Sequence, residues 1–119
     1  MQSFVELEVW QVGLDLVKEI YRLTKKLPKD ELFGLTSQMR RSSTSILTNL
    51  AEGFSRFTYP DKAAKYTIAR GECGETKALL LICVALELLP PNDIREAQSR
   101  SESVGRMLSG LIRASKSRS

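Results

Sequence analysis

The chain has 119 residues, of which 42% are hydrophobic and 27% charged, and its formal net charge is +4. That length fits one globular domain, and the composition is typical of a folded protein rather than a disordered one. No apolar run reaches the roughly 18 residues of a membrane span, and Glu6 and Glu8 interrupt the region where a signal peptide would be apolar. We therefore expect one domain over residues 1–119, in the cytoplasm and without a membrane partner.

The first predicted helix covers about residues 5–27. Its inward stripe has apolar residues or glycine at steps of three and four, and a second apolar stripe runs beside it. The second stripe indicates either a subunit interface or a generous core. The inward stripe consists of Val9, Gly13, Leu16, Ile20, Leu23 and Leu27, and the second of Trp10, Leu14, Val17 and Tyr21.

The second predicted helix, about residues 34–57, is unusual because Ser, Thr and Asn are concentrated between positions 42 and 49. Each costs about 0.5 kcal/mol of helix propensity relative to Ala, and Gly53 costs about 1 kcal/mol. We expect these small residues to allow close helix packing, with Arg41, Asn49 and Glu52 bonding across helix contacts. The predicted inward stripe is Leu35, Met39, Ser43, Ile46, Leu50, Gly53 and Phe57.

The third predicted helix runs over about residues 59–89, from an N-cap at Thr58 to a stop at Pro90 and Pro91. Its expected inward stripe places Glu75 at or beside the core, where a carboxylate needs a cationic partner such as Arg41 or Arg70. That stripe is Ile68, Gly71, Glu75, Leu79, Ile82 and Leu86.

Two cysteines, Cys73 and Cys83, lie ten residues apart in this predicted third helix, about 15 Å along its axis. A disulfide needs Cα atoms within about 7 Å, so we expect two reduced, buried thiols.

The fourth predicted helix covers about residues 92–115, with an inward stripe of Ile94, Ala97, Ser101, Val104, Leu108 and Leu111. Four helices joined by short loops predict an all-α fold, an up-down-up-down four-helix bundle. Gly13, Gly53 and Gly71 fall on inward stripes, where we expect them to let neighbouring helices approach closely.

The motifs LEVWQ, GLTSQMRR, NLAEG and ARGECGE occur in this order along the chain. In order and spacing the chain resembles a family of small bacterial four-helix-bundle proteins, first noticed as reading frames within intervening sequences of large-subunit ribosomal RNA genes. The accessory variability determinant of diversity-generating retroelements, which binds a reverse transcriptase and nucleic acid, is related to that family.

The resemblance implies a left-handed bundle that assembles into a homopentameric ring. It also implies a set of motif residues that form a polar network: Trp10, Gln38, Arg41, Asn49, Glu52, Gly53, Arg70, Gly71 and Glu75.

Catalysis has little support in the sequence. The chain has no histidine, which removes the usual nucleophile–histidine pairs and the Glu-x-x-His motif of di-iron bundles. We expect a protein that is not an enzyme and that needs no cofactor or metal.

Two functional classes fit the excess of positive charge. The first is an accessory protein that contacts RNA or DNA phosphates, and the second is a scaffold for an unidentified protein, with incidental charge. Arg41 is expected to pair internally, and we expect no cluster of exposed aromatics to stack bases. The candidate phosphate contacts are Arg40, Arg56, Arg95, Arg106, Arg113 and Lys116.

Overall fold

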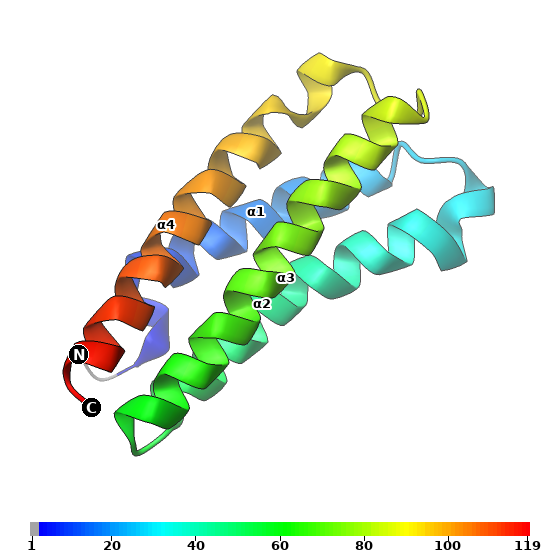
Figure 1. Cartoon of the computed structure of the whole chain (residues 1–119). Coiled ribbons are helices and arrows are strands. Elements are labelled where there is room, and N and C mark those ends of the chain that lie inside the picture. The colour runs from blue at the N-terminus through cyan, green and yellow to red at the C-terminus, as the bar shows by residue number, and fades with distance from the viewer. Residues whose placement is uncertain (1–2) are drawn as a thin grey trace.

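The computed structural model describes residues 3–119, and within this range the chain is all helical, without strands. The long helices are α1 (Glu8–Thr24), α2 (Ser37–Ser55), α3 (Tyr59–Ala85) and α4 (Arg95–Ser117), which lie side by side (Figure 1). Short helical turns cover Phe4–Glu6, Lys29–Glu31, Leu32–Thr36 and Pro91–Ile94. The predicted all-α class with four long helices is therefore confirmed.

Each helix packs against the one that follows it, and α4 also packs against α1. Their buried side chains form one hydrophobic cluster along the molecule, which measures 45 × 24 × 21 Å.

In the described part of the chain, every helix is too short or too polar to cross a lipid bilayer.

The helices are shorter than predicted because turns occupy their ends. Before α2, Gly34 leaves helical geometry (φ −113°, ψ −111°), and the Glu31 carboxylate accepts a hydrogen bond from Leu35 N at 3.1 Å. At the start of α3, the predicted cap is present, since Thr58 Oγ1 accepts from Asp61 N at 3.2 Å.

The end of α3 is a left-handed turn at Glu87, whose φ is 59°. Leu88 N donates to Cys83 O, and Glu87 N donates to Val84 O, both at 2.9 Å. This pair of bonds is the Schellman pattern, which normally carries glycine at the left-handed position. The turn ends the helix four residues before the predicted limit at Leu89.

The inward stripes of α1 and α2 are largely as predicted. All six stripe residues of the first helix are buried. In α2 the stripe from Met39 to Gly53 is buried as well, but Phe57 lies beyond the helix end and is 100% exposed. In α4 the stripe holds as far as Leu108, after which Ile112 takes the inward position predicted for Leu111.

The predicted phase of α3 was wrong. Ile68, Ile82 and Leu86 are exposed, and of the predicted stripe only Leu79 is buried. The core-facing residues are instead mostly small or polar, with a few larger side chains among them. Their periodic signal is weak, and the bulky apolar run 78–86 determined the predicted phase in its place. The core-facing residues are Ala63, Tyr66, Ala69, Cys73, Thr76, Leu79, Leu80 and Cys83.

Glu75 consequently lies beside the core's edge and not within it. Its side chain is 41% exposed and forms an ion pair with Arg41 of α2. The predicted partner, Arg41, was right, but the predicted burial of Glu75 was wrong, because α3 is rotated about its axis relative to the predicted phase.

The buried hydroxyls of α2 are satisfied inside the protein. Ser42 Oγ and Thr76 Oγ1 share a hydrogen bond of 2.8 Å across the α2–α3 contact, where both residues are fully buried. Ser43 and Thr44 donate back to the carbonyl of Arg40, a common alternative for hydroxyls within a helix.

Glycine has different consequences at its two motif positions. A Cβ added at Gly53 would lie 2.7 Å from the buried ring of Tyr66, so this glycine permits close packing of α2 and α3. A Cβ at Gly71 would meet nothing within 4 Å, contrary to the prediction that Gly71 also serves close packing.

Alanine substitutions at these two glycines should have opposite effects. Gly71→Ala should stabilise the fold by about 1 kcal/mol through helix propensity. Gly53→Ala should destabilise it by about 1 kcal/mol, because overpacking of about 2 kcal/mol outweighs the same propensity gain. Denaturant unfolding of both variants and the parent measures this; stabilisation of both to the same extent would contradict the close packing at Gly53.

The two cysteine thiols should be unreactive in the folded protein. Both are free and buried, and burial raises the pKa of Cys73 to about 11 and also raises that of Cys83. Below such a pKa the reactive thiolate is scarce, so iodoacetamide at pH 8 should modify neither residue until denaturant is added. Mass spectrometry reports the modification, and a Ser117→Cys variant provides an exposed thiol as the control. Rapid labelling of the native parent would overturn this expectation.

Candidate nucleic-acid interface

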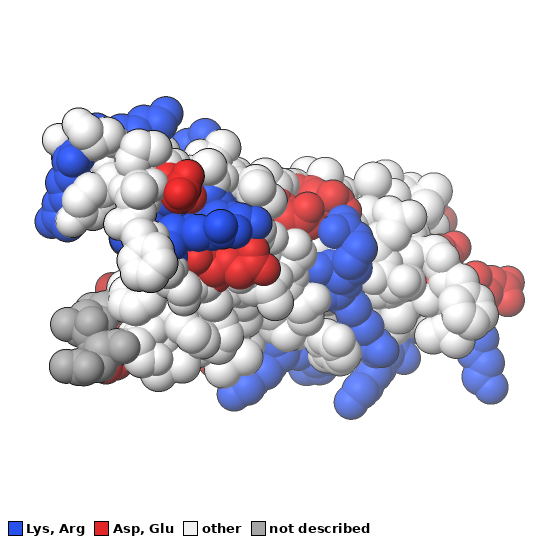
Figure 2. Space-filling view, turned by 90° about the horizontal axis from the view of Figure 1, so that it is seen from below, with Lys and Arg blue, Asp and Glu red and all other residues white. Residues whose placement is uncertain are grey.

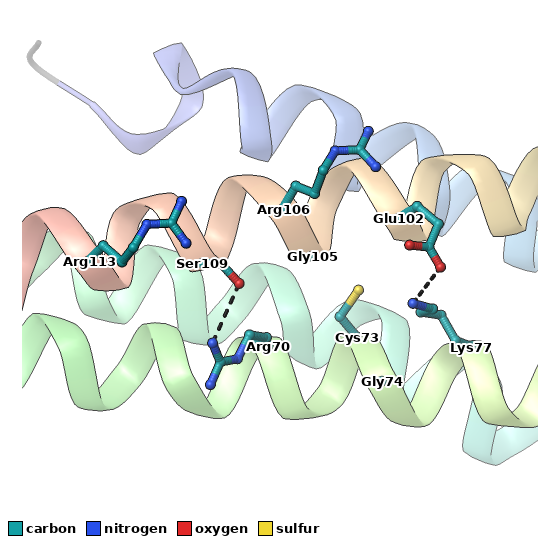
Figure 3. Close-up of a pocket in the computed structure, with 9 residues that line it drawn as sticks. All are labelled: Arg70, Cys73, Gly74, Lys77, Glu102, Gly105, Arg106, Ser109 and Arg113. Atoms are coloured by element: carbon teal, nitrogen blue, oxygen red, sulfur yellow. Dashed lines mark hydrogen bonds and ion pairs between the residues drawn. The ribbon is translucent and has the colours of Figure 1, made fainter.

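A groove with a volume of about 560 Å³ lies between α3 and α4. Four cationic side chains and one acidic side chain line it. We call it the α3–α4 groove (Figure 3). Its lining residues are Arg70, Cys73, Gly74 and Lys77 from α3, and Glu102, Gly105, Arg106, Ser109 and Arg113 from α4.

Glycine keeps the groove open. Gly74 belongs to the α3 wall and Gly105 to the α4 wall, and a Cβ added at either would meet no atom within 4 Å. The thiol of Cys73 lies beneath them, almost fully buried, and donates to Ser101 O at 3.3 Å. The floor of the groove is therefore neutral, and the two glycines in its walls leave open space above it.

Three guanidinium groups along the groove lack an acidic partner in the described part of the chain. Arg70 donates to Ser109 Oγ at 3.4 Å, and Arg106 donates to Ser103 Oγ at 3.3 Å. No ion pair involves Arg70, Arg106 or Arg113 among residues 3–119. Guanidinium groups that are exposed and unpaired have donors available for phosphate or carboxylate oxygens.

The one carboxylate of the groove is already paired. Lys77 Nζ lies 2.6 Å from Glu102 Oε1, and hydrogen bonding from Lys77 lowers the pKa of Glu102, with a smaller contribution from Arg106. Glu102 thus neutralises Lys77 chiefly, and the charge of the three arginines remains available to an anion.

Repetition along both helices builds this arrangement. Arg70 and Lys77 are seven residues apart on α3, and Arg106 and Arg113 are seven apart on α4, so each pair occupies one helix face about 10 Å long. Sequence reasoning identified the α4 pair but missed Arg70 and Lys77 as anion contacts. The spacing signal was present, but the incorrect phase of α3 concealed it.

The other predicted phosphate contacts lie elsewhere. Arg95 is exposed at the start of α4, beyond the groove, and Arg56 and Lys116 are exposed near the opposite end of the molecule. Arg40 is half-buried, donates to Thr24 Oγ1 at 2.9 Å and lies 4.5 Å from the centre of the Tyr21 ring. It takes part in the packing of α1 against α2, so we remove it from the candidate contacts.

The predicted polar network separates into local pairs between α2 and α3. Arg41 pairs with Glu72 and Glu75, as its predicted internal pairing required, and hydrogen bonding to Glu75 raises the pKa of Arg41. Glu52 pairs with Lys65 at 2.8 Å, and this contact lowers the pKa of Glu52.

Two amide side chains of the predicted network, Asn49 and Gln38, are not part of these ion pairs. Asn49 donates to Ser45 O at 2.9 Å within its own helix, so the expected bond from Asn49 to a neighbouring helix is not present. Gln38 is exposed.

The second stripe of α1 is only partly covered by the chain itself. Trp10 and Val17 pack against the core, and the Trp10 ring meets Phe4 edge-on with a centroid distance of 4.8 Å. Leu14 and Tyr21 are exposed.

Residues 3–119 contain no group of three or more side chains placed to hold a metal ion. Figure 2 shows Lys and Arg side chains spread over the side of the molecule that it displays, including one group at the end drawn at the left.

Comparison with known proteins identifies the fold and the family. A solved structure of a protein with unknown function from the S23 ribosomal protein family, from Bacteroides thetaiotaomicron, is 26% identical, with a TM-score of 0.80. The match covers 87% of this chain and 97% of that chain. A search of curated proteins finds no match. The family model described as 23S rRNA-intervening sequence protein matches residues 5–110. Because that match spans most of the chain, this protein belongs to the family of 23S rRNA-intervening sequence proteins.

Proposed function

We propose that this protein is a non-enzymatic accessory protein that binds RNA through its phosphates, using the α3–α4 groove. The observation that carries the proposal is the set of three arginines, Arg70, Arg106 and Arg113, which line one groove without acidic partners in the described chain.

The chemistry of the groove favours contact with the RNA backbone. One guanidinium group can donate two parallel hydrogen bonds to the oxygens of a phosphate, and such contacts supply affinity without reading the base sequence. The groove lining contains no aromatic side chain, and its hydroxyls and glycines offer little discrimination between bases. We therefore expect binding that depends on charge and shape.

Assembly would strengthen these contacts. We propose that the chain forms an up-down-up-down, left-handed bundle and that five copies close into a ring, the arrangement implied by the resemblance described above. Five chains of net charge +4 carry +20, and a ring presents the same groove five times. Weak contacts repeated on one ligand add in free energy, so a ring binds RNA where a single groove would not.

A second candidate is a scaffold for another protein. Leu81 and Ile82 are exposed on the last turns of α3, and Leu86, the residue that caps its C-terminal end, is exposed next to them. An apolar face of this kind is typical of protein contacts. Loss of RNA binding with the apolar face intact would leave this candidate in place.

RNA binding should depend on the groove and on salt. We expect the parent protein to bind labelled RNA at low salt, with affinity falling steeply as salt rises. Arg106→Glu with Arg113→Glu should reduce binding strongly and lower the slope of log affinity against log salt by about two, or about one per lost phosphate contact. Glu102→Gln should strengthen binding because it removes the groove's acid. Fluorescence anisotropy measures each affinity.

The matched control carries the same change in charge outside the groove, Lys18→Glu with Lys25→Glu. Both residues are exposed and neither lines the groove. If this control loses as much affinity as the groove variant, net charge and not the groove determines binding. If the intact parent binds no RNA at low salt, the proposal is wrong.

The oligomeric state should follow from the exposed part of the second stripe on α1. Light scattering should give a mass of five chains, and Leu14→Asp should lower it without loss of helix, because a buried carboxylate is costly at an interface. The same change at exposed Ile68 on α3 should leave the mass unchanged. A monomer at micromolar concentration contradicts the ring.

A further inference from the structure

Phe57 is the most exposed large apolar residue of the described chain. It lies between α2 and α3, and its exposure is 100%, while the neighbouring Tyr59 is 38% exposed. A side chain in full contact with water adds nothing to the core, so packing does not account for a phenylalanine at this position. The helical spacing had predicted the opposite, a core-facing Phe57.

The hollow that Phe57 lines contains one cationic and two acidic side chains, Arg56 with Glu52 and Asp61, and further cationic residues follow in the chain and at the end of α4. Arg56 precedes Phe57 directly, whereas Lys62 Nζ donates to Phe54 O at 2.7 Å and Lys65 pairs with Glu52. The C-terminal end of the chain adds three more cationic residues, Arg113, Lys116 and Arg118. Arg118 reaches over the ring of Tyr59 at 5.7 Å from its centre. Lys116 shares a hollow with Pro60 and Ala64 of α3, which shows that the end of α4 adjoins the start of α3.

The acidic residues at this end are few. Segments 52–65 and 113–119 contain six cationic and two acidic side chains, Glu52 and Asp61. Glu52 is held by Lys65 at 2.8 Å. Glu6 and Glu8 belong to the same end of the molecule, and Glu8 lines a separate hollow between α1 and α4 with Gly110 and Leu111.

A line of hollows leads from Phe57 as far as Lys116, and the α3–α4 groove begins beyond it. The hollow beside Phe57 shares Arg56 and Asp61 with the next, which in turn shares Ala64 and Ile68 with the hollow at Lys116. Arg70 follows Ile68 by two residues on α3, and Arg113 precedes Lys116 by three residues on α4; both line the groove. The path from Tyr59 to Cys73 follows α3 for about 21 Å.

We propose that Phe57 is a stacking platform for an unpaired base, and that the ligand of the groove is a single-stranded nucleic acid running from Phe57 along α3 and α4. This inference rests on the function proposed above and specifies its ligand. In a duplex each base is already stacked between its neighbours, whereas a base of a single strand is free to lie against an exposed aromatic ring. Phosphates of the same strand would meet Arg56, Lys116, Arg113 and Arg106 in turn.

The structure also supplies a matched control for Phe57. Phe33 is 92% exposed and lies before the start of α2, whereas Phe57 follows its end, so the two rings are at opposite ends of the helix. Phe33 lines none of the five hollows described above, including the α3–α4 groove. Alanine at either position removes the same exposed side chain.

The test measures anisotropy with labelled oligouridine of 20 nucleotides, the DNA oligothymidine of equal length, and an RNA duplex. Base stacking is worth about 1–3 kcal/mol, so Phe57→Ala should weaken single-strand binding by about tenfold and leave duplex binding unchanged. Phe57→Trp should retain binding, and its fluorescence should be quenched by the single strands. Phe33→Ala should match the parent. Equal effects on oligouridine and oligothymidine mean that stacking does not distinguish RNA from DNA.

Two results would overturn the stacking role. The first is unchanged single-strand affinity in Phe57→Ala while the Arg106→Glu, Arg113→Glu variant loses binding; the groove proposal then stands and the stacking proposal falls. The second is a changed mass in light scattering for Phe57→Ala, which would make Phe57 a contact between subunits. If no nucleic acid binds the parent, both proposals fall together.

Discussion

Hydroxyl groups that are buried between two helices must find hydrogen-bond partners inside the protein, because water does not reach them. Ser42 and Thr76 meet this requirement through each other, at full burial, between α2 and α3. Their bond forms only at one rotation of α3 about its axis. Gly53 reinforces that rotation, since the ring of Tyr66 occupies the space in which a side chain at 53 would lie.

This rotation determines what α3 presents to its surroundings. With Thr76 and Cys73 inward, the next positions around the helix place Arg70 and Lys77 on the side of α4, and Glu72 and Glu75 on the side of Arg41. The ion pairs of Arg41 are half exposed and contribute little free energy, typically under 1 kcal/mol. They follow from the packing of α2 against α3 and do not impose it. The groove likewise follows from that packing, with Gly74 and Gly105 leaving its walls bare.

Sequence periodicity could predict the helices and the core faces of α1, α2 and α4, since in each an apolar stripe lies opposite a polar face. It failed for α3 because residues 78–86 are apolar on every side and allow several phases, while its true core face contains Ala, Cys and Thr. The error carried over to the site. Arg106 and Arg113 were found from their spacing, but Arg70 was considered only as a possible partner of Glu75 and a member of the polar network. Phe57 was missed for a local reason, because the helix ends at Ser55 and the stripe had been extended past it.

The neighbourhood of the chain ends has a practical consequence for studying the protein. The first turn, Phe4–Glu6, and the last helix turn before Ser117 lie at the same end of the bundle (Figure 1), and the hollow between Leu7 and Leu111 brings the two segments together. This is also the end that carries Phe57. A purification tag or fluorescent protein fused at either end would stand beside that surface and add its own charge and bulk. A reporter inserted between α3 and α4, near Pro90, would sit at the far end of the bundle, away from it.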